Sequence, residues 1–482
     1  MKPISRWLGL LPSFMLLAAC AGWPGHVQAP ERSDTRASAL LTPGAGDWPS
    51  AQWWSSLGDT QLQDWIKRAQ SQAPQMLLAA AQLDEARAGL QLAQAQKKAQ
   101  VSLDSSVTRE RFSANSYIPP PFGGQFYNDG ELSANFHYDL DFWGRQRQAL
   151  KAALGEARAR SYELQGQADW IAARVVTLYL SLQVAQARLD RLQNQQRLRQ
   201  QRLQLDEQRV HTGLLAEDAL ELQRQALLQT EQAYQEQLGQ REQLWVDLQQ
   251  WVGLPRQQLV LQVRPLPSLI QTMPATLQLD LLARRSDLAA ALARVEAAAA
   301  RAEVARTDFY PDVSLGMFAG WSSLILSRWL NQSSSTYGIA PAVHLPLFDG
   351  GRLRAHLNEE KAALLSADAS YRQVLMTAIT QVNSAQVRIA QAQAQRACLA
   401  QRLQELDRHA LNLQQRHAAG LIDEHTLLDS AVERLDLLDA DAHWNEELLL
   451  AQVALIEALG GGFKAPAQAD TRPPQTTRIP HD

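Results

Sequence analysis

Two parts of this chain carry the same pattern of residues, and each repeated residue lies 207 positions after its first occurrence, as from Arg145 to Arg352. The repeated positions are Arg145, Arg147, Leu150, Arg209, Gly213, Leu214, Glu217, Leu220 and Gly253, which recur as Arg352, Arg354, Leu357, Arg416, Gly420, Leu421, Glu424, Leu427 and Gly460. No insertion interrupts the register between the first pair and the last. The pattern indicates a tandem duplication, so the fold contains one structural plan twice.

Each half alternates helical and extended segments, which defines the predicted organisation of the chain. The predicted segments are a signal peptide over 1–19, a lipidated tether over 20–50, a first repeat over 51–265, a second repeat over 266–460 and a flexible tail over 461–482. The first repeat starts with a helix, and the remaining predicted elements are a β-hairpin over 101–142, a long helical hairpin over 145–252, a helix over 277–307, a β-hairpin over 312–348 and a long helical hairpin over 352–459.

The predicted strands have one apolar and one polar face. From Leu132 to Phe142, apolar side chains alternate with serine, asparagine, histidine and aspartate at the period of a β-strand. One interpretation packs the apolar face against a helix in a soluble domain, and another places it against lipid with the polar face towards water. A membrane barrel needs about eight strands or more, so four strands per chain could span a membrane only in a barrel shared between chains.

The longest helices have the spacing of a coiled coil. Apolar residues step by four and three positions from Leu178 to Val210, with polar interruptions. A helix from Arg145 to about His211 would be roughly 100 Å long at 1.5 Å per residue, which predicts a rod and not a globular domain.

Each rod is predicted to reverse at a glycine, Gly213 in the first repeat and Gly420 in the second. Glycine tolerates the left-handed conformation that ends a helix, so its recurrence has a backbone reason. The leucines that follow, Leu214 and Leu421, have two interpretations. They are either hydrophobic contacts across the helix end, which the residues alone favour, or docking points at the end of the rod.

The first residues have the features of a secretory signal. A basic start is followed by an apolar run and by Leu17-Ala18-Ala19-Cys20, which is similar to the bacterial lipobox. Cys20 would then carry acyl chains as a membrane anchor; the alternative is an ordinary signal peptide with an incidental cysteine. Ala21 takes the place of the aspartate that retains lipoproteins in the inner membrane, which favours delivery to the outer membrane.

The remaining composition argues against several other classes of protein. A formal charge of −4 gives no basic surface for nucleic acid, and beyond the signal no apolar run approaches the length of a helical membrane span. The sequence contains no phosphate-binding loop, zinc motif or nucleophile elbow. It therefore predicts no enzyme, no metal site and no cofactor other than the lipid on Cys20. His409, His417 and His425 are expected to be solvated or to face the turn, and Cys398 to be a small core residue.

Several motifs together resemble a known family. They are Leu17-Ala18-Ala19-Cys20, Trp53-Trp54 with Leu57-Gly58-Asp59, Tyr138-Asp139-Leu140-Asp141-Phe142-Trp143-Gly144-Arg145, Arg285-Ser286-Asp287-Leu288 ahead of Tyr310-Pro311, and Leu345-Pro346-Leu347-Phe348-Asp349-Gly350-Gly351-Arg352. In this order they resemble the outer-membrane efflux proteins, the outer-membrane factors of tripartite pumps, and more closely the NodT-type lipoproteins among them. Ser286 departs from the family pattern, which usually has proline there.

The resemblance implies a fold of the α+β class made mostly of long α-helices. It implies a homotrimer with a twelve-stranded transmembrane β-barrel, continuous with a periplasmic coiled-coil barrel of helices. It places contacts with a periplasmic adaptor at Arg209, Gly213, Leu214, Arg416, Gly420 and Leu421, and a periplasmic gate at Leu421, Asp423 and Glu424. The other interpretation of Asp423 and Glu424 is that they favour the start of a helix.

The predicted function is therefore a passive, lipid-anchored channel of the outer membrane that extends into the periplasm and exports small molecules. An inner-membrane transporter would drive export through the adaptor, and the chain itself would have no catalytic residue. Two alternatives remain open at this point: a duct for secreted proteins of the type I kind, and a lipid-anchored periplasmic coiled-coil adaptor or scaffold.

Overall fold

A computed structural model describes residues 25–27, 46–115, 121–267, 272–274 and 284–464. The predicted signal peptide, Cys20 and most of the predicted tether and tail lie outside the described residues. The chain divides into two compact units. The first comprises Met1–Glu31, Asp84–Ala159 and Ala291–Tyr371, and the second comprises Arg32–Leu83, Arg160–Ala290 and Arg372–Asp482.

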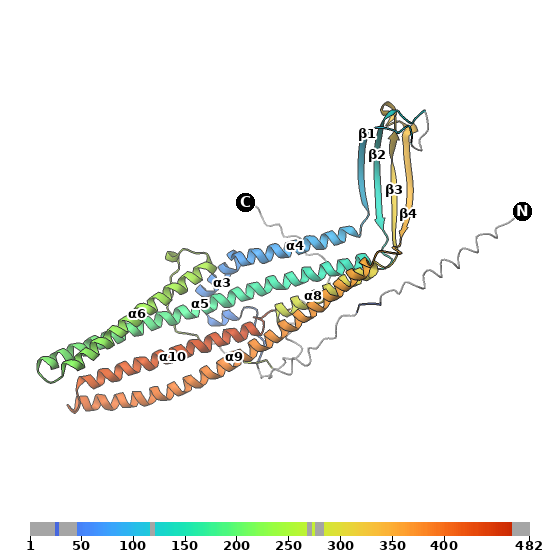
Figure 1. Ribbon diagram of the computed structural model, residues 1–482. Coiled ribbons are helices and arrows are strands. Elements are labelled where there is room, and N and C mark those ends of the chain that lie inside the picture. Colours follow the sequence, from blue (N-terminus) through green and yellow to red (C-terminus); the bar gives the residue numbers. More distant parts are fainter. Residues whose placement is uncertain (1–24, 28–45, 116–120, 268–271, 275–283, 465–482) are drawn as a thin grey trace. The chain divides into compact units, whose positions relative to one another are not determined.

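Long helices make up most of the described chain (Figure 1). The α-helices are α3 (Thr60–Gln72), α4 (Pro74–Gln96), α5 (Arg145–His211), α6 (Glu217–Val252), α8 (Ser286–Thr307), α9 (Arg352–Ala418) and α10 (Glu424–Ala458). The strands are β1 (Gln100–Arg111), β2 (Phe126–Asp139), β3 (Asp312–Ser323) and β4 (Ser335–His344). Short 3₁₀ helices lie at Trp53–Leu57, Arg256–Gln258, Leu326–Arg328 and Gln332–Ser334. The helix predicted over 277–307 is described from Ser286, and most of its predicted earlier part lies outside the described residues.

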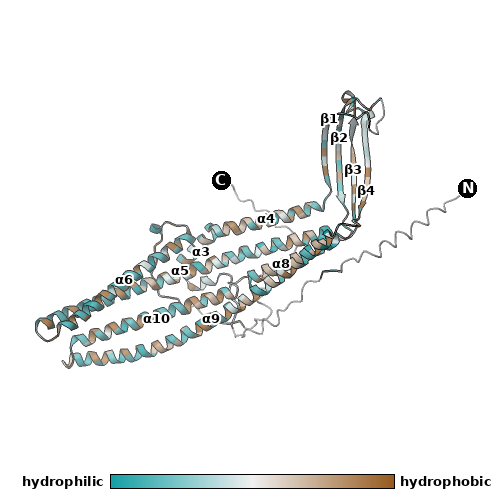
Figure 2. Ribbon diagram, viewed as in Figure 1, coloured by the Kyte–Doolittle hydropathy of each residue, from teal (hydrophilic) through white to brown (hydrophobic). Residues whose placement is uncertain are grey.

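The duplication seen in the sequence is preserved in the helices. Helices α5 and α9 both have 67 residues, and both their starts and their ends lie at repeat-equivalent positions. Helix α6 runs beside α5 and α10 runs beside α9, which gives two helical hairpins (Figure 1). Hydrophilic and hydrophobic residues are mixed along the whole of these helices (Figure 2).

The four strands form one antiparallel sheet in the order β1-β2-β3-β4. The central pair, β2 and β3, joins the hairpins of the two repeats, with Phe136 opposite Met317. Among the described residues, the outer edges of β1 and β4 pair with no further strand. Unpaired edges carry a row of free backbone donors and acceptors, which is a template for pairing with another chain.

The strand register produces the two faces that the sequence predicts. Val101, Phe136, Met317 and Ile339 form one apolar row across the sheet, while Asp104 and Ser133 belong to the polar face. Val101 is 73% exposed and Ile339 is 72% exposed. No described helix therefore covers the apolar face at its outer strands, and the soluble interpretation of this sheet is wrong.

The strands end earlier than the alternating pattern suggests. Strand β2 stops at Asp139 and β4 at His344, although the predicted hairpins extend to 142 and 348. The residues after β2 cap the start of α5. The Asp141 carboxylate accepts hydrogen bonds from the backbone N–H groups of Gln146 and Arg147, at 3.1 Å each. A side-chain oxygen that satisfies free N–H groups at a helix start competes with continued strand pairing.

The core of the second unit gathers aromatic and branched side chains from four helices. Its buried residues include Leu62 and Trp65 of α3, Tyr179 of α5, Trp245 of α6 and Ile456 of α10. The Trp65 ring meets the rings of Tyr179 and Trp245 edge to face, at centroid distances of 5.8 and 6.1 Å. The burial of such large rings makes this cluster the main stabilising contact of α3.

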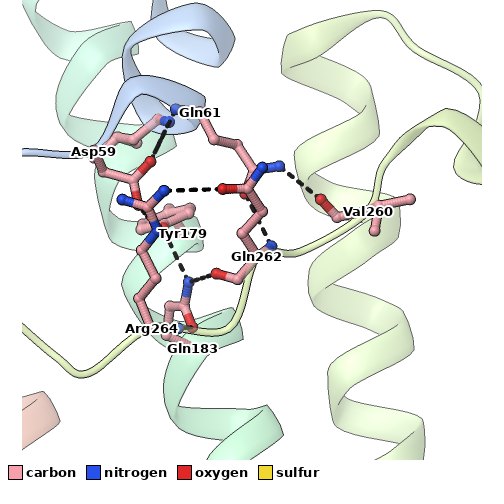
Figure 3. A network of polar contacts seen from close by, with 8 residues as sticks. Asp59, Gln61, Tyr179, Gln183, Val260, Gln262 and Arg264 are labelled. Atoms are coloured by element: carbon pink, nitrogen blue, oxygen red, sulfur yellow. Dashed lines mark hydrogen bonds and ion pairs between the residues drawn. The ribbon is translucent and has the colours of Figure 1, made fainter.

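A polar network fixes α3 and a neighbouring extended segment against α5 (Figure 3). Asp59 caps α3 by accepting a hydrogen bond from the Gln61 backbone N–H at 2.9 Å, and it also accepts one from the Tyr179 hydroxyl. The Gln183 amide donates to the Tyr179 oxygen at 2.9 Å and to the Gln262 carbonyl at 2.7 Å. Because buried polar groups are costly when unpaired, this closed network determines where the segment around Gln262 lies.

Helix α9 has a buried residue at every seventh position through the second unit. These residues are Ala378, Ala385, Ala392, Leu399, Leu406 and Leu413. Cys398 is exposed, so its prediction as a core residue is wrong. It directly precedes the buried Leu399, and adjacent residues of an α-helix point about 100° apart.

Candidate functional site at the two helical turns

The two turns that reverse the hairpins have the same backbone geometry. In the first turn, the Leu214 N–H donates to the Arg209 carbonyl at 2.8 Å, and in the second, the Leu421 N–H donates to the Arg416 carbonyl at 2.9 Å. The glycine before each leucine has a positive φ, 74° at Gly213 and 71° at Gly420. These are the features of a Schellman cap, which explains why the arginine, glycine and leucine recur together.

The leucines of the caps point into solvent. Leu214 is 72% exposed and Leu421 is 70% exposed. The hydrophobic contact that often accompanies this type of cap does not bury either side chain, so the interpretation that the residues alone favoured is wrong. Two exposed leucines at equivalent turns remain available for a partner.

Asp423 starts α10 and binds the first turn. Its carboxylate accepts hydrogen bonds from the Thr426 backbone N–H at 3.4 Å and from the Thr426 hydroxyl at 3.0 Å, so it is an N-cap. The Arg209 guanidinium donates to the same carboxylate at 2.9 Å. Partial burial acts to raise the pKa of Asp423, but the bonds from Thr426 and the Arg209 charge outweigh it and hold this pKa below its usual value. The carboxylate is therefore ionised throughout the neutral range.

The other predicted residues of the turns have fewer contacts. Glu424 and Arg416 are exposed, and neither side chain has a hydrogen bond or ion pair with any described residue. The structure thus brings Arg209 and Asp423 together, while Arg416, Leu421 and Glu424 face solvent.

Behind the turns lies a buried charged cluster that the sequence did not reveal. The Asp206 side chain is 1% exposed and forms a short hydrogen bond with His425 of α10. Arg202 lies 3.7 Å from the Asp206 carboxylate and also contacts Asp429. His425 is largely buried against Asp206, so it is not solvated, although it lies in the first turn of α10, next to the turn that the other expectation named. Only a tertiary contact between the repeats identifies the pair, although Asp206 does interrupt the apolar seam of α5.

The cluster continues into a row of polar contacts between α5 and α10. Ser181 donates to Glu446 at 2.7 Å, Arg191 to Asp439 at 3.0 Å and Gln195 to Asp436 at 2.6 Å. Burial raises the pKa of Glu446, which the bond from Ser181 only partly opposes. The seam between the two hairpins is thus mainly polar in this region.

Within the second hairpin, the helices join through both apolar side chains and ion pairs, the latter including Arg396 with Asp441 at 3.1 Å and Arg434 with Asp407 at 2.7 Å. Leu399 and Leu406 of α9 pack with Leu437 of α10, and Trp444 packs against this cluster. The second hairpin thus combines an apolar cluster with partly exposed charged contacts.

No described helix is long and apolar enough to cross a membrane. Nor do the described ranges contain a group of three or more His, Cys, Asp or Glu side chains that could hold a metal ion.

Comparison with known proteins gives the class of the chain. Its fold matches the outer membrane protein VceC of Vibrio cholerae with a TM-score of 0.78 and 27% identity, over 86% of this chain and all of that one. It also matches the CmeC outer membrane channel of Campylobacter jejuni with a TM-score of 0.81 and 20% identity, over 92% of this chain and 96% of that one. The fold is thus that of outer-membrane channels.

Sequence relatives agree with this class. The chain is 29% identical to the putative multidrug resistance outer membrane protein MdtQ of Shigella flexneri, over 95% of this chain and 98% of that protein. It is 28% identical to the multidrug resistance outer membrane protein MdtP of Escherichia coli K12, over 96% and 98% of the two chains. The family model for the outer membrane efflux protein matches residues 65–254 and 278–461.

The chain therefore belongs to the outer membrane efflux protein family. The resemblance to the outer-membrane efflux proteins is confirmed, and so is the predicted function as an efflux channel of the outer membrane that extends into the periplasm. The family is one of transport proteins and not of enzymes.

Proposed function

We propose that this chain is the outer-membrane subunit of a tripartite efflux system, and that it conducts small molecules passively as a homotrimer. The observation that carries the trimer is the sheet, with unpaired edges on β1 and β4 and an uncovered apolar face. Three copies would supply twelve strands, which is enough to close a membrane barrel. The lipid-anchored scaffold is disfavoured, because a scaffold outside the membrane would expose this face to water. A duct for secreted proteins would use the same fold.

The exported compounds are proposed from the relatives, which are named as multidrug resistance proteins. The energy for export would come from an inner-membrane transporter, coupled through a periplasmic adaptor. We place the adaptor contact at the two caps, because their equivalent leucines are exposed. The chain would have no catalytic activity of its own.

We place the periplasmic gate at Leu421, Asp423 and Glu424, as the family resemblance implies. In a trimer, a ring of three equivalent carboxylates would repel anions and attract cations. The contact between Arg209 and Asp423 would hold this gate closed by tying the two hairpins of each chain together.

Cys20 is proposed to carry the lipid anchor. Support comes from the residues Leu17-Ala18-Ala19-Cys20 after an apolar run. Cells grown with labelled palmitate should incorporate label into the chain, and Cys20→Ser should abolish that incorporation. Label retained by the Cys20→Ser variant would contradict the assignment.

Deletion of the gene tests the efflux function. A deletion strain should become more susceptible to at least one member of a panel of toxic small molecules, and a copy of the gene should restore resistance. Unchanged susceptibility across the panel, combined with reduced secretion of a protein, would favour the secretion duct instead.

A further inference from the structure

The four described strands separate their charged side chains by sign. All of their carboxylates belong to the polar face of the sheet, at Asp104, Glu110, Asp129, Glu131, Asp139 and Asp312. Their two arginines, Arg109 and Arg111 of β1, belong instead to the apolar face, opposite Asn128 and Phe126. Both arginines are exposed. An anionic partner on the apolar face would therefore meet two cations and no carboxylate from the strands.

The two arginines lie at the end of the sheet that is farther along the chain from the helices. Strand β1 begins just after α4 and β2 ends just before α5, so the turn between the strands is the distal end. Because the channels of this family extend into the periplasm, the distal end corresponds to the outer leaflet of the membrane.

The depth of the arginines matches a lipid headgroup. Along β2, the rise from Asn128, opposite Arg109, to Asp139 is roughly 37 Å at 3.4 Å per residue. At a tilt of about 45° this length spans roughly 26 Å of membrane, close to the apolar band of about 25 Å in membrane barrels. A cation on the lipid-facing side is destabilising at the midplane and nearly neutral at the interface, so Arg109 is placed at the headgroups.

The loop between β3 and β4 adds aromatic rings to the same end of the apolar face. A Cβ built on Gly130, whose position belongs to that face, would come within 2.9 Å of the Trp329 ring. The Trp329 indole N–H donates to the Trp321 carbonyl at 3.4 Å. The Arg109 guanidinium lies 5.7 Å from the centroid of the Phe126 ring. Aromatic side chains flank the apolar band of membrane barrels at both interfaces, which agrees with the depth derived from the strand.

We propose that Arg109 and Arg111 bind a phosphate of lipid A, the membrane-embedded part of lipopolysaccharide, on the lipid-facing side of the sheet. This inference rests on the proposed function, which places the sheet in the outer membrane. The outer leaflet of that membrane is built from lipopolysaccharide, and the phosphates of lipid A lie just above its acyl chains. A guanidinium binds phosphate through two parallel hydrogen bonds, and the neighbouring rings supply apolar contact area for the sugar and the acyl chains.

Binding of lipid A to the purified full-length trimer in a nonionic detergent tests the site. The affinity for fluorescently labelled lipid A is measured for the unmodified chain and for the double variant Arg109→Gln/Arg111→Gln. The matched control is Arg402→Gln, because Arg402 is exposed on α9 without a partner among the described residues. Native gels check that each variant forms the trimer.

The double variant should bind lipid A at least about tenfold more weakly than the unmodified trimer, because charge-assisted hydrogen bonds to the phosphate are lost. Arg402→Gln should bind lipid A as the unmodified trimer does. Equal affinities in all three proteins would overturn the proposal. Phosphatidylglycerol at the same concentration should not displace lipid A, and its displacement of the label would overturn the assignment to lipid A.

A second measurement needs only the unmodified chain, so it decides even if the double variant does not assemble. The trimer should bind dephosphorylated lipid A at least about tenfold more weakly than lipid A itself, and equal affinity would contradict the phosphate contact. Failure of the proposed function would look different, because the unmodified chain would then form no trimer or no pore in a planar bilayer. Failure of this site alone leaves trimers and pores intact.

Discussion

Replacing Asp206 by asparagine should loosen the junction between α5 and α10 without changing its shape. The Asp206 side chain is 1% exposed, and its carboxylate contacts His425 and lies 3.7 Å from Arg202. Breaking a fully buried ion pair costs about 3–5 kcal/mol. In Asp206→Asn, Arg202 keeps its contact with Asp429 and the asparagine keeps a hydrogen bond. We therefore expect a smaller loss of stability at this junction, about 2 kcal/mol. At about 1.4 kcal/mol per factor of ten, local opening should become roughly 30-fold more frequent.

Hydrogen exchange of the purified trimer measures this opening. Backbone amides in the first turns of α10 should exchange roughly 30-fold faster in Asp206→Asn, while those of the apolar core around Leu248 should not change. The control is Asp190→Asn, because Asp190 is exposed on the same helix and, among the described residues, its carboxylate accepts a hydrogen bond only from Gln186. Equal exchange in the two variants would refute the role of the buried cluster.

Three further predictions concern stability, measured by thermal unfolding of the purified protein. Gly420→Ala should lower the free energy of unfolding by about 1–2 kcal/mol, because Gly420 has a φ of 71°. Gly239→Ala, in the interior of α6, should instead raise it by about 0.5–1 kcal/mol. A gain in stability at Gly420 would contradict the cap. Tyr179→Phe should lower the free energy of unfolding by about 1–3 kcal/mol, because the buried Asp59 carboxylate loses the Tyr179 hydroxyl donor and keeps only its other partners. Tyr234→Phe should cost less, because the Tyr234 hydroxyl has no contact among the described residues, and equal losses in the two variants would exclude the network in Figure 3. Burial raises the pKa of Asp169 from 3.8 to about 7, so the folded chain keeps this proton longer than the unfolded chain, and stability falls as pH rises between those values. Asp169→Asn should therefore stabilise the protein more at pH 8 than at pH 4, and a pH-independent effect would rule out this titration.

Local patterns in the sequence were sufficient to predict the helices and strands and to identify the family. The repeat placed Gly213 and Gly420 at the ends of two equal helices, because a left-handed cap requires glycine at a fixed position. Strand alternation predicted both faces of the sheet, since side chains alternate along any strand. Strand ends were less predictable, because Asp141 caps the next helix and the alternating pattern does not register that competition.

The site required contacts that the sequence does not encode locally. Asp206 and His425 belong to different repeats, so their pairing depends on how two hairpins meet. The exposure of Leu214 and Leu421 is likewise a tertiary property, because a Schellman cap is compatible with a buried or an exposed leucine. Cys398 was misplaced because a one-residue shift on a helix exchanges a buried position for an exposed one.

Conductance of the purified protein in a planar bilayer tests the central claim most directly. A passive channel with a closed gate should appear as trimer-sized pores of low conductance. Charge removal at Asp423 and Glu424 should increase that conductance and reduce its preference for cations, because the acidic ring and the contact with Arg209 are lost. Absence of any trimer-sized pore, even after both carboxylates are removed, would contradict the account.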